Sequence, residues 1–135
     1  MSVTTEPRVL TIADAAEATG LTAHTLRYYE RDGLLLDHVG RAPSGHRRYT
    51  EDDLSWIVMI TRLRSTGMPI REVRAYADLC REGPGNETQR LALLHAHRRR
   101  VLAQLAEVQE NLAAIEFKIG IYEVRVADGV PQTAP

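Results

Sequence analysis

The feature that most constrains the fold of this 135-residue chain is a proline-free segment, residues 86–124, with a regular apolar stripe. Apolar residues recur at steps of three and four, the period of about 3.5 residues that makes a coiled-coil seam, and only Arg98 interrupts it. The seam consists of Leu91, Leu94, Val101, Leu105, Val108, Leu112, Ile115, Ile119 and Tyr122. No other segment is long enough to cover this stripe, so we expect one long helix that pairs with a second copy of the chain. The alternative is a long helix packed on its own globular domain.

Two short helices joined by a tight turn are predicted near the N-terminus. Thr11 and Thr22 are placed to cap the first and the second helix, and Gly20 can adopt the left-handed conformation that ends the first. Leu26 and Tyr29 lie three residues apart, so both are expected to face the core. This arrangement is typical of a helix-turn-helix, which places its second helix in a DNA groove. The alternative is an ordinary helical hairpin within a core.

The segment that follows, residues 34–49, is expected to form a short hairpin or wing, because it contains Gly40, Pro43 and Gly45. Its second part, residues 41–49, holds three arginines and a histidine without an acid. The net charge of the whole chain is only −1. A basic edge on a nearly neutral chain favours site-selective DNA binding over indiscriminate coating of DNA.

A connector of two helices is predicted between the wing and the long helix. Thr50 and Asp53 form a second capping box, Gly67 closes the helix that it opens, and Pro69 suits the first turn of the next helix. The run Gly83–Gly85 then breaks the chain. The predicted division is a winged helix-turn-helix at 9–50, a connector at 51–83, the dimerisation helix at 86–124 and a flexible tail at 125–135.

Three motifs resemble the MerR family of bacterial transcriptional regulators: LRYYERDGLL at 26–35, GHRRYTEDDL at 45–54 and LRSTGMPI at 63–70. The resemblance covers nearly the whole chain, from about residue 9 to 124. It implies a mainly α fold with a winged helix-turn-helix, a two-helix connector and a long C-terminal helix that forms an antiparallel coiled-coil dimer. It also implies a homodimer on a near-palindromic promoter operator, which distorts the DNA so that the RNA polymerase holoenzyme engages both promoter elements. The alternative is a structural DNA-organising protein with a coiled-coil stalk.

The outward face of the second helix supplies the first candidate DNA contacts. Arginine can bind a guanine edge or a phosphate, and a tyrosine hydroxyl can bind a phosphate. The resemblance favours Arg27 and Tyr28 for these roles. The alternative for Arg27 is a solvent-exposed arginine that pairs with Glu30 or Asp32. The candidates on this helix are His24, Arg27, Tyr28 and Arg31.

The wing supplies the remaining candidates. Arg47 and Arg48 are neighbours on a predicted strand, so their side chains should point to opposite sides. By the resemblance, Arg47 fits the wing arginine of the family better. Arg41 and His46 are secondary candidates, whereas Tyr49 is expected in the core.

The sequence does not identify the effector to which such a regulator would respond. The single cysteine, Cys80, lies on the apolar stripe of the second connector helix. It is either a buried small hydrophobic residue or a thiol sensor, with a thiol pKa that Arg74 and Arg81 would lower. The sequence resembles the short aldehyde- or thiol-responsive branch of the family, but Arg62 stands where that branch carries its cysteine. The tail after the long helix lacks the Cys and His of metal-sensing relatives, so no metal or cofactor is expected, and a small-molecule or electrophile effector stays open.

Other classes of protein are disfavoured. There is no Gly-rich phosphate loop, nucleophile elbow or paired catalytic carboxylate motif, so we expect no enzyme. No apolar run approaches the roughly 18 residues that span a bilayer, so a cytoplasmic location without a membrane partner is expected. Trp56, Met59, Tyr76 and Phe117 are expected in the core, with a small-ligand site between the connector and the long helix as the alternative.

Overall fold

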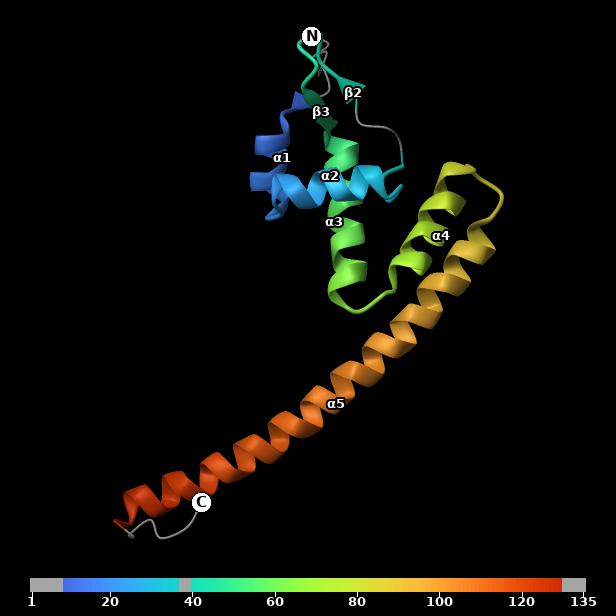
Figure 1. The fold of residues 1–135 in the computed structure, drawn as a ribbon. Helices are drawn as coiled ribbons and strands as arrows, with labels where there is room; N and C mark the ends of the chain where they lie inside the picture. The colour runs from blue at the N-terminus through green and yellow to red at the C-terminus, as the bar shows by residue number, and fades with distance from the viewer. Residues whose placement is uncertain (1–8, 37–39, 130–135) are drawn as a thin grey trace, which may run out of the picture. The chain divides into compact units, whose positions relative to one another are not determined.

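The computed structural model describes residues 9–36 and 40–129, apart from the side chain of Arg47 (Figure 1). Most of these residues are helical, and a small sheet accompanies the helices. The chain divides into two compact units, Met1–His95 and Ala96–Pro135. The prediction of a mainly α fold with a wing and a long C-terminal helix is confirmed.

The first two helices begin and end where their local signals predict. Helix α1 (Ile12–Thr19) starts after Thr11, whose side chain accepts a hydrogen bond from the backbone of Asp14 at 3.1 Å. It ends at Gly20, which has a φ of 74°, a conformation that costs glycine no steric clash. Helix α2 (Ala23–Arg31) starts after Thr22, whose side chain accepts from the backbone of Thr25 at 3.1 Å.

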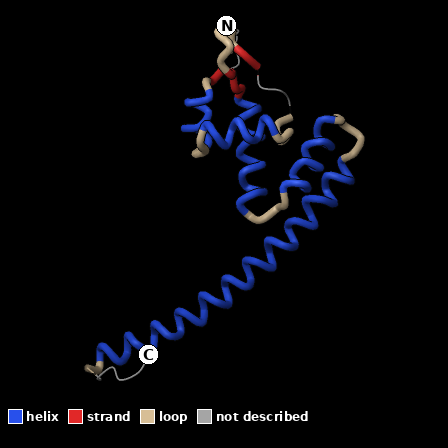
Figure 2. The backbone as a smooth tube through the Cα atoms, viewed as in Figure 1, coloured by secondary structure: helices blue, strands red, loops and turns tan. Residues whose placement is uncertain are grey.

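The wing is a small antiparallel sheet with the strand order β1-β3-β2. Strand β2 (Gly40–Arg41) and strand β3 (Arg47–Thr50) form the predicted hairpin, with Gly40 opposite Arg48. Figure 2, where strands are red, shows β3 running directly into the next helix. Strand β1 (Val9–Leu10) was not predicted, because two residues are too few for an alternating pattern.

The connector consists of α3 (Glu51–Ser65) and α4 (Ile70–Arg81). The capping box at the start of α3 is complete: the Thr50 backbone donates to the Asp53 carboxylate at 2.9 Å, and the Asp53 backbone donates to the Thr50 hydroxyl at 3.1 Å. Pro69 precedes α4 as its N-cap residue, one position earlier than the predicted first turn. The resulting helix pair lies between the wing and the long helix in the sequence, as predicted.

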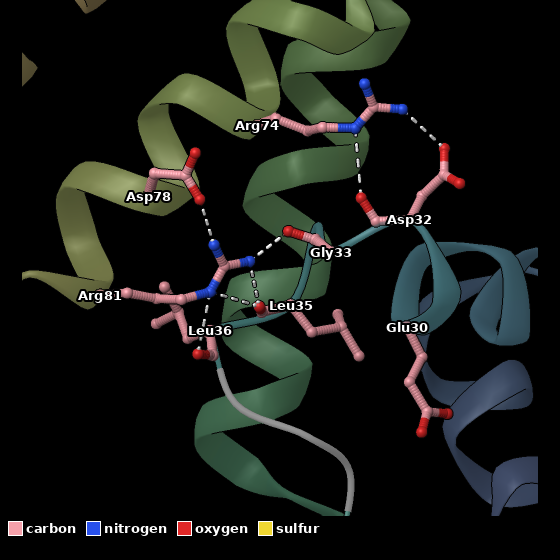
Figure 3. A pocket seen from close by; sticks show the side chains of 8 residues that line it. All are labelled: Glu30, Asp32, Gly33, Leu35, Leu36, Arg74, Asp78 and Arg81. Carbon is pink, nitrogen blue, oxygen red and sulfur yellow. Dashed lines mark hydrogen bonds and ion pairs between the residues drawn. The ribbon is translucent and has the colours of Figure 1, made fainter.

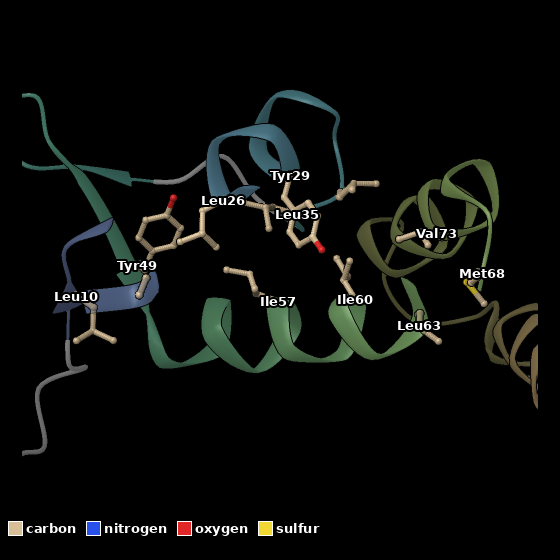
Figure 4. Packing of buried hydrophobic residues seen from close by; sticks show 12 residues of the cluster. Leu10, Leu26, Tyr29, Leu35, Tyr49, Ile57, Ile60, Leu63, Met68 and Val73 are labelled. Carbon is tan, nitrogen blue, oxygen red and sulfur yellow. The ribbon is translucent and has the colours of Figure 1, made fainter. Parts of the chain in front are cut away.

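The core of the first unit joins α2, β3 and α3 (Figure 4). Leu26 and Tyr29 on α2 face Ile57 and Ile60 on α3, and Tyr49 of β3 is fully buried beside them. Burial of one such aliphatic side chain contributes about 1.5–3 kcal/mol to folding. This packing holds α2 with one face inward and leaves its other face outward.

The long helix α5 (Glu87–Ala127) is 41 residues long and runs three residues beyond the predicted end at position 124. Where it begins, Leu94 is partly buried against the core of the first unit. In the second unit the five central seam residues are between 48% and 61% exposed: Leu105, Val108, Leu112, Ile115 and Ile119. Their exposure means that the single chain leaves this apolar stripe uncovered. No helix within 9–36 or 40–129 is long and apolar enough to cross a membrane.

Candidate nucleic-acid interface

The outward face of α2 is polar and basic. His24, Arg27 and Arg31 follow one another at steps of three and four, so they share one face of the helix, and all three are exposed. Tyr28 is partly exposed beside them. Since Leu26 and Tyr29 are buried on the opposite face, α2 presents its candidate contacts as one surface.

The wing is joined to α2 by an ion pair. The Arg41 guanidinium of β2 lies 3.9 Å from the Glu30 carboxylate of α2 and donates to the Gly45 carbonyl at 3.3 Å. In the turn of the hairpin, the Ser44 hydroxyl and Nδ1 of His46 are 2.9 Å apart. The ion pair joins the wing to α2, and the contacts of Arg41 with Gly45 and of Ser44 with His46 order the turn itself.

Neighbouring side chains on β3 point to opposite faces of the sheet. Arg48 is exposed whereas Tyr49, the next residue, is fully buried, as opposite faces of a strand require. The prediction of a core role for Tyr49 therefore agrees with its burial. The side chain of Arg47 lies outside the described part of the structure, so its assignment to DNA stays a prediction.

The acids that were the alternative partners of Arg27 are bonded to other arginines. Glu30 pairs with Arg41, and Asp32 pairs with Arg74 of α4 at 3.0 Å. Arg27 itself is exposed on the α2 surface. This arrangement favours the DNA-facing interpretation of Arg27 over the ion pair.

A latch of two arginines ties the end of α2 to α4 (Figure 3). Arg81 donates to the backbone carbonyls of Gly33, Leu35 and Leu36, with its Nη2 at 2.7 Å from the Leu35 oxygen. Arg74 donates to the Asp32 carbonyl at 3.2 Å and to its carboxylate at 3.0 Å. A cavity of about 350 Å³ lies between these groups. We refer to Arg74 and Arg81 as the connector latch.

Tyr28 and Asp32 also shift each other's pKa through a side-chain hydrogen bond. This hydrogen bond is the main cause that raises the pKa of Tyr28, with a smaller contribution from desolvation. The same hydrogen bond, followed by that from Arg74, holds the pKa of Asp32 below its ordinary value. Asp32 is thus shared between a candidate DNA contact and the connector.

Two family models match the chain: "MerR HTH family regulatory protein" over residues 10–80 and "MerR, DNA binding" over residues 54–116. The chain belongs to the MerR family. An uncharacterised HTH-type transcriptional regulator of Haemophilus influenzae is 36% identical over 119 residues, which cover 88% of this chain and 87% of that protein. The regulator AdhR of Bacillus subtilis is 41% identical over 93 residues, 69% of this chain and 66% of AdhR.

The fold agrees with a solved MerR structure. HiNmlR, a MerR family regulator lacking the sensor domain and crystallised bound to promoter DNA, superposes with a TM-score of 0.82 at 35% identity. The match covers 90% of this chain and 92% of HiNmlR. This MerR protein is therefore a DNA-binding transcriptional regulator of the helix-turn-helix type, and its family is one of regulators rather than enzymes.

Cys80 of this MerR protein is half-buried on α4. It adjoins Tyr76, and the pKa of the Tyr76 phenol is raised. The main cause is burial, and the charge of Cys80 and a hydrogen bond with Cys80 add to it. Arg74 and Arg81, which were expected to lower the thiol pKa, donate instead to the end of α2 and its loop. A sensory role for Cys80 therefore stays a prediction without support from its arginines.

The aromatic and methionine residues that were expected in the core differ in their burial. Trp56, Met59 and Tyr76 pack against the core of the first unit, which agrees with the core interpretation. Phe117, in contrast, is 73% exposed on α5, so the expectation that it lies in the core of the single chain is wrong. Sequence periodicity alone could have shown this, because Phe117 lies off the seam. Within the described ranges, no three His, Cys, Asp or Glu side chains gather as metal ligands.

Proposed function

We propose that this regulator binds promoter DNA with α2 in the major groove and the wing on the adjoining backbone. The observation that carries the proposal is the exposed face of α2, held outward by a buried inner face. Arg27 and His24 would contact base edges, and Tyr28 and Arg31 would contact phosphates. In the wing, Arg41, His46, Arg47 and Arg48 would bind the flanking backbone.

The regulator would act as a homodimer through an antiparallel coiled coil of α5. The uncovered seam residues support this, because a soluble monomer rarely exposes a long continuous apolar stripe. A two-fold dimer presents two copies of α2, so its operator should contain two inverted half-sites. The proposed organisation keeps the winged domain at 9–50, the connector at 51–83 and the dimerisation helix at 86–124.

Control of transcription would come from distortion of the operator. Bending or untwisting DNA costs several kcal/mol, which a dimer recovers through additional contacts on the deformed duplex. Such a change would align the two promoter elements for RNA polymerase, and an effector would shift the equilibrium between two dimer states. Membership in the MerR family supports this mechanism, and HiNmlR was itself crystallised on promoter DNA.

Selection from random duplex DNA followed by variant binding tests the proposal. Wild-type protein should enrich a site with two inverted half-sites. On that site, Arg27→Ala should weaken binding by about 1–3 kcal/mol and relax the base preference at one position in each half-site. Titration by fluorescence anisotropy at fixed salt measures the affinity.

Arg71→Ala is the matched control, because Arg71 is an exposed arginine on α4 that is not among the proposed DNA contacts. It should bind the selected site nearly as wild type does. If Arg27→Ala also bound normally at moderate salt, its assignment would be wrong. Genome-wide binding separates the two functions: one or a few promoters indicate a regulator, whereas many dispersed sites indicate a DNA organiser.

A further inference from the structure

The backbone that leaves α2, residues 32–36, is bonded to α2 on one side and to the connector on the other. We refer to these residues as the exit segment. The backbone N–H of Asp32 donates to the Tyr28 carbonyl at 2.9 Å, and that of Leu34 donates to the Tyr29 carbonyl at 3.0 Å. The carbonyls of the exit segment instead accept from side chains of α3 and α4. All five successive carbonyls have such a donor: Arg74 for Asp32, Arg81 for Gly33, Leu35 and Leu36, and Trp56 for Leu34.

Arg81 makes most of these contacts (Figure 3). Its Nη2 donates to the carbonyls of Gly33 and Leu35, at 2.7 Å from the Leu35 oxygen. Its Nε donates to Leu35 at 3.1 Å and to Leu36 at 3.2 Å, and Nη1 donates to the Asp78 carboxylate on α4. The planar guanidinium allows this, because it carries several N–H donors in a fixed fork. One side chain, 31% exposed, therefore fixes three carbonyls of the exit segment to α4.

The far end of α4 is bonded in turn to the start of α5. The side-chain amide of Asn86 donates to the Leu79 carbonyl at 2.8 Å. The Arg90 guanidinium, in the first turn of α5, donates to the same carbonyl at 3.3 Å and to the Gly83 carbonyl. All these residues belong to the first unit. A path of hydrogen bonds thus runs from the first turn of α5 through α4 to the exit segment.

We propose that Arg81 is a positioning residue for operator recognition, because it fixes α2 relative to the helices that lead to the dimer seam. The inference rests on the proposed function, since it requires a dimer whose two copies of α2 read two half-sites. In that dimer the two copies meet through α5, so the path from α5 to α2 sets the separation of the two DNA-reading surfaces. Arg81 is not among the proposed DNA contacts. It acts through the exit segment on the spacing of half-sites that the dimer accepts.

Two affinities test this proposal: that for an isolated half-site, and that for full operators with a spacer one base pair longer or shorter than the selected one. Such a change moves and rotates one half-site relative to the other, since about ten base pairs make one helical turn. Arg81→Ala should bind the isolated half-site as wild type does, because Leu26 and Tyr29 still hold α2 with its basic face outward. Its preference for the selected spacing should fall by about three-fold or more.

Arg71→Ala is the matched control, since it also removes one exposed positive charge from α4. It should keep the spacing preference of wild type. The proposal is wrong if Arg81→Ala keeps that preference, or if Arg71→Ala loses it to the same extent. An Arg81→Ala protein that is folded by circular dichroism but loses half-site affinity and full-operator affinity equally would also overturn it, because Arg81 would then act within each half-site.

Arg81→Lys carries the test if Arg81→Ala does not fold. It keeps the positive charge beside Asp78, but an ammonium group lacks the planar fork that binds three carbonyls at once. We therefore expect Arg81→Lys to lose spacing preference while it keeps half-site affinity. A wild-type spacing preference in this variant would show that the charge alone suffices. Failure of both variants to fold would make Arg81 a determinant of folding and would overturn the proposal as well.

The wild-type protein separates this inference from the proposed function. If it selects no pair of inverted half-sites, the proposed function is wrong, and this inference fails with it. If it selects such a pair at a defined spacing and the folded Arg81 variants keep that spacing, only the positioning role of Arg81 is wrong.

Discussion

At the scale of single residues, Trp56 links three parts of the first unit. Its indole nitrogen donates to the Leu34 carbonyl at 2.7 Å, and its ring stacks on Tyr76 with centroids 5.6 Å apart and an angle of 13°. Leu34 is fully buried in the loop after α2, and Tyr76 belongs to α4. The single tryptophan of the chain thus connects α3 to the loop after α2 and to α4.

Trp56→Phe should lower the free energy of unfolding by about 1–3 kcal/mol, because the buried Leu34 carbonyl loses its indole donor while an aromatic ring remains. Urea denaturation followed by circular dichroism measures the change, since the variant has no tryptophan fluorescence. Tyr76→Phe, which keeps the stacked ring, is the control and should cost less. A loss below about 0.3 kcal/mol for Trp56→Phe would show that the hydrogen bond does not stabilise the fold.

At the scale of elements, the start of α5 carries a charge that responds to pH. The Glu87 carboxylate accepts the backbone N–H of Gly85 at 2.9 Å. Hydrogen bonds from the backbone of Glu87 itself and of Gly85, with the charge of Arg90, hold its pKa below its ordinary value of 4.5. A negative charge there also interacts favourably with the N-terminal end of the helix dipole.

A depressed folded-state pKa means that Glu87 stabilises the fold above its unfolded pKa, and that this contribution disappears as the pH falls through the folded value. We therefore expect Glu87→Gln to be less stable than wild type at pH 7 and equally stable in strong acid. Thermal unfolding of both proteins from about pH 7 down to pH 2 measures the difference. A difference that stays constant over this range would contradict the assignment.

At the scale of the whole molecule, the uncovered apolar stripe of α5 predicts a dimer. Ile115 on the seam is 57% exposed in the single chain, and Phe117 on the opposite face is 73% exposed. Ile115→Glu places a charge at a position that the proposed dimer would bury, so it should yield monomers where wild type is dimeric. Operator affinity should fall with it, because a monomer binds only one half-site.

Phe117→Glu is the matched control, since it makes the same change at an exposed apolar residue off the seam. It should remain dimeric in sedimentation equilibrium, with unchanged helix content. Equal dissociation of both variants would place the interface elsewhere on α5. A wild-type protein that is monomeric at micromolar concentration would remove the coiled coil from the proposed mechanism.

Local physics made much of this molecule predictable. Thr11, Thr22 and Thr50 cap their helices through contacts only three residues away, and Gly20 ends α1 through its own φ. The seam of α5 follows from a repeat of seven residues. The outward face of α2 follows from the burial of Leu26, which its spacing already indicated.

Contacts between distant segments were decided by the tertiary structure alone. Strand β1 exists only because Leu10 meets Tyr49 across the sheet, and two residues carry no pattern of their own. Arg74 and Arg81 bind groups 42 to 48 residues earlier in the chain, and as sequence they resemble any solvent-exposed arginines. The sequence by itself therefore determined the helices, the DNA-reading motif and the family. Only the packed chain brought the Asp32 carboxylate within 3.0 Å of the Arg74 guanidinium, because that contact depends on how α4 lies against the end of α2.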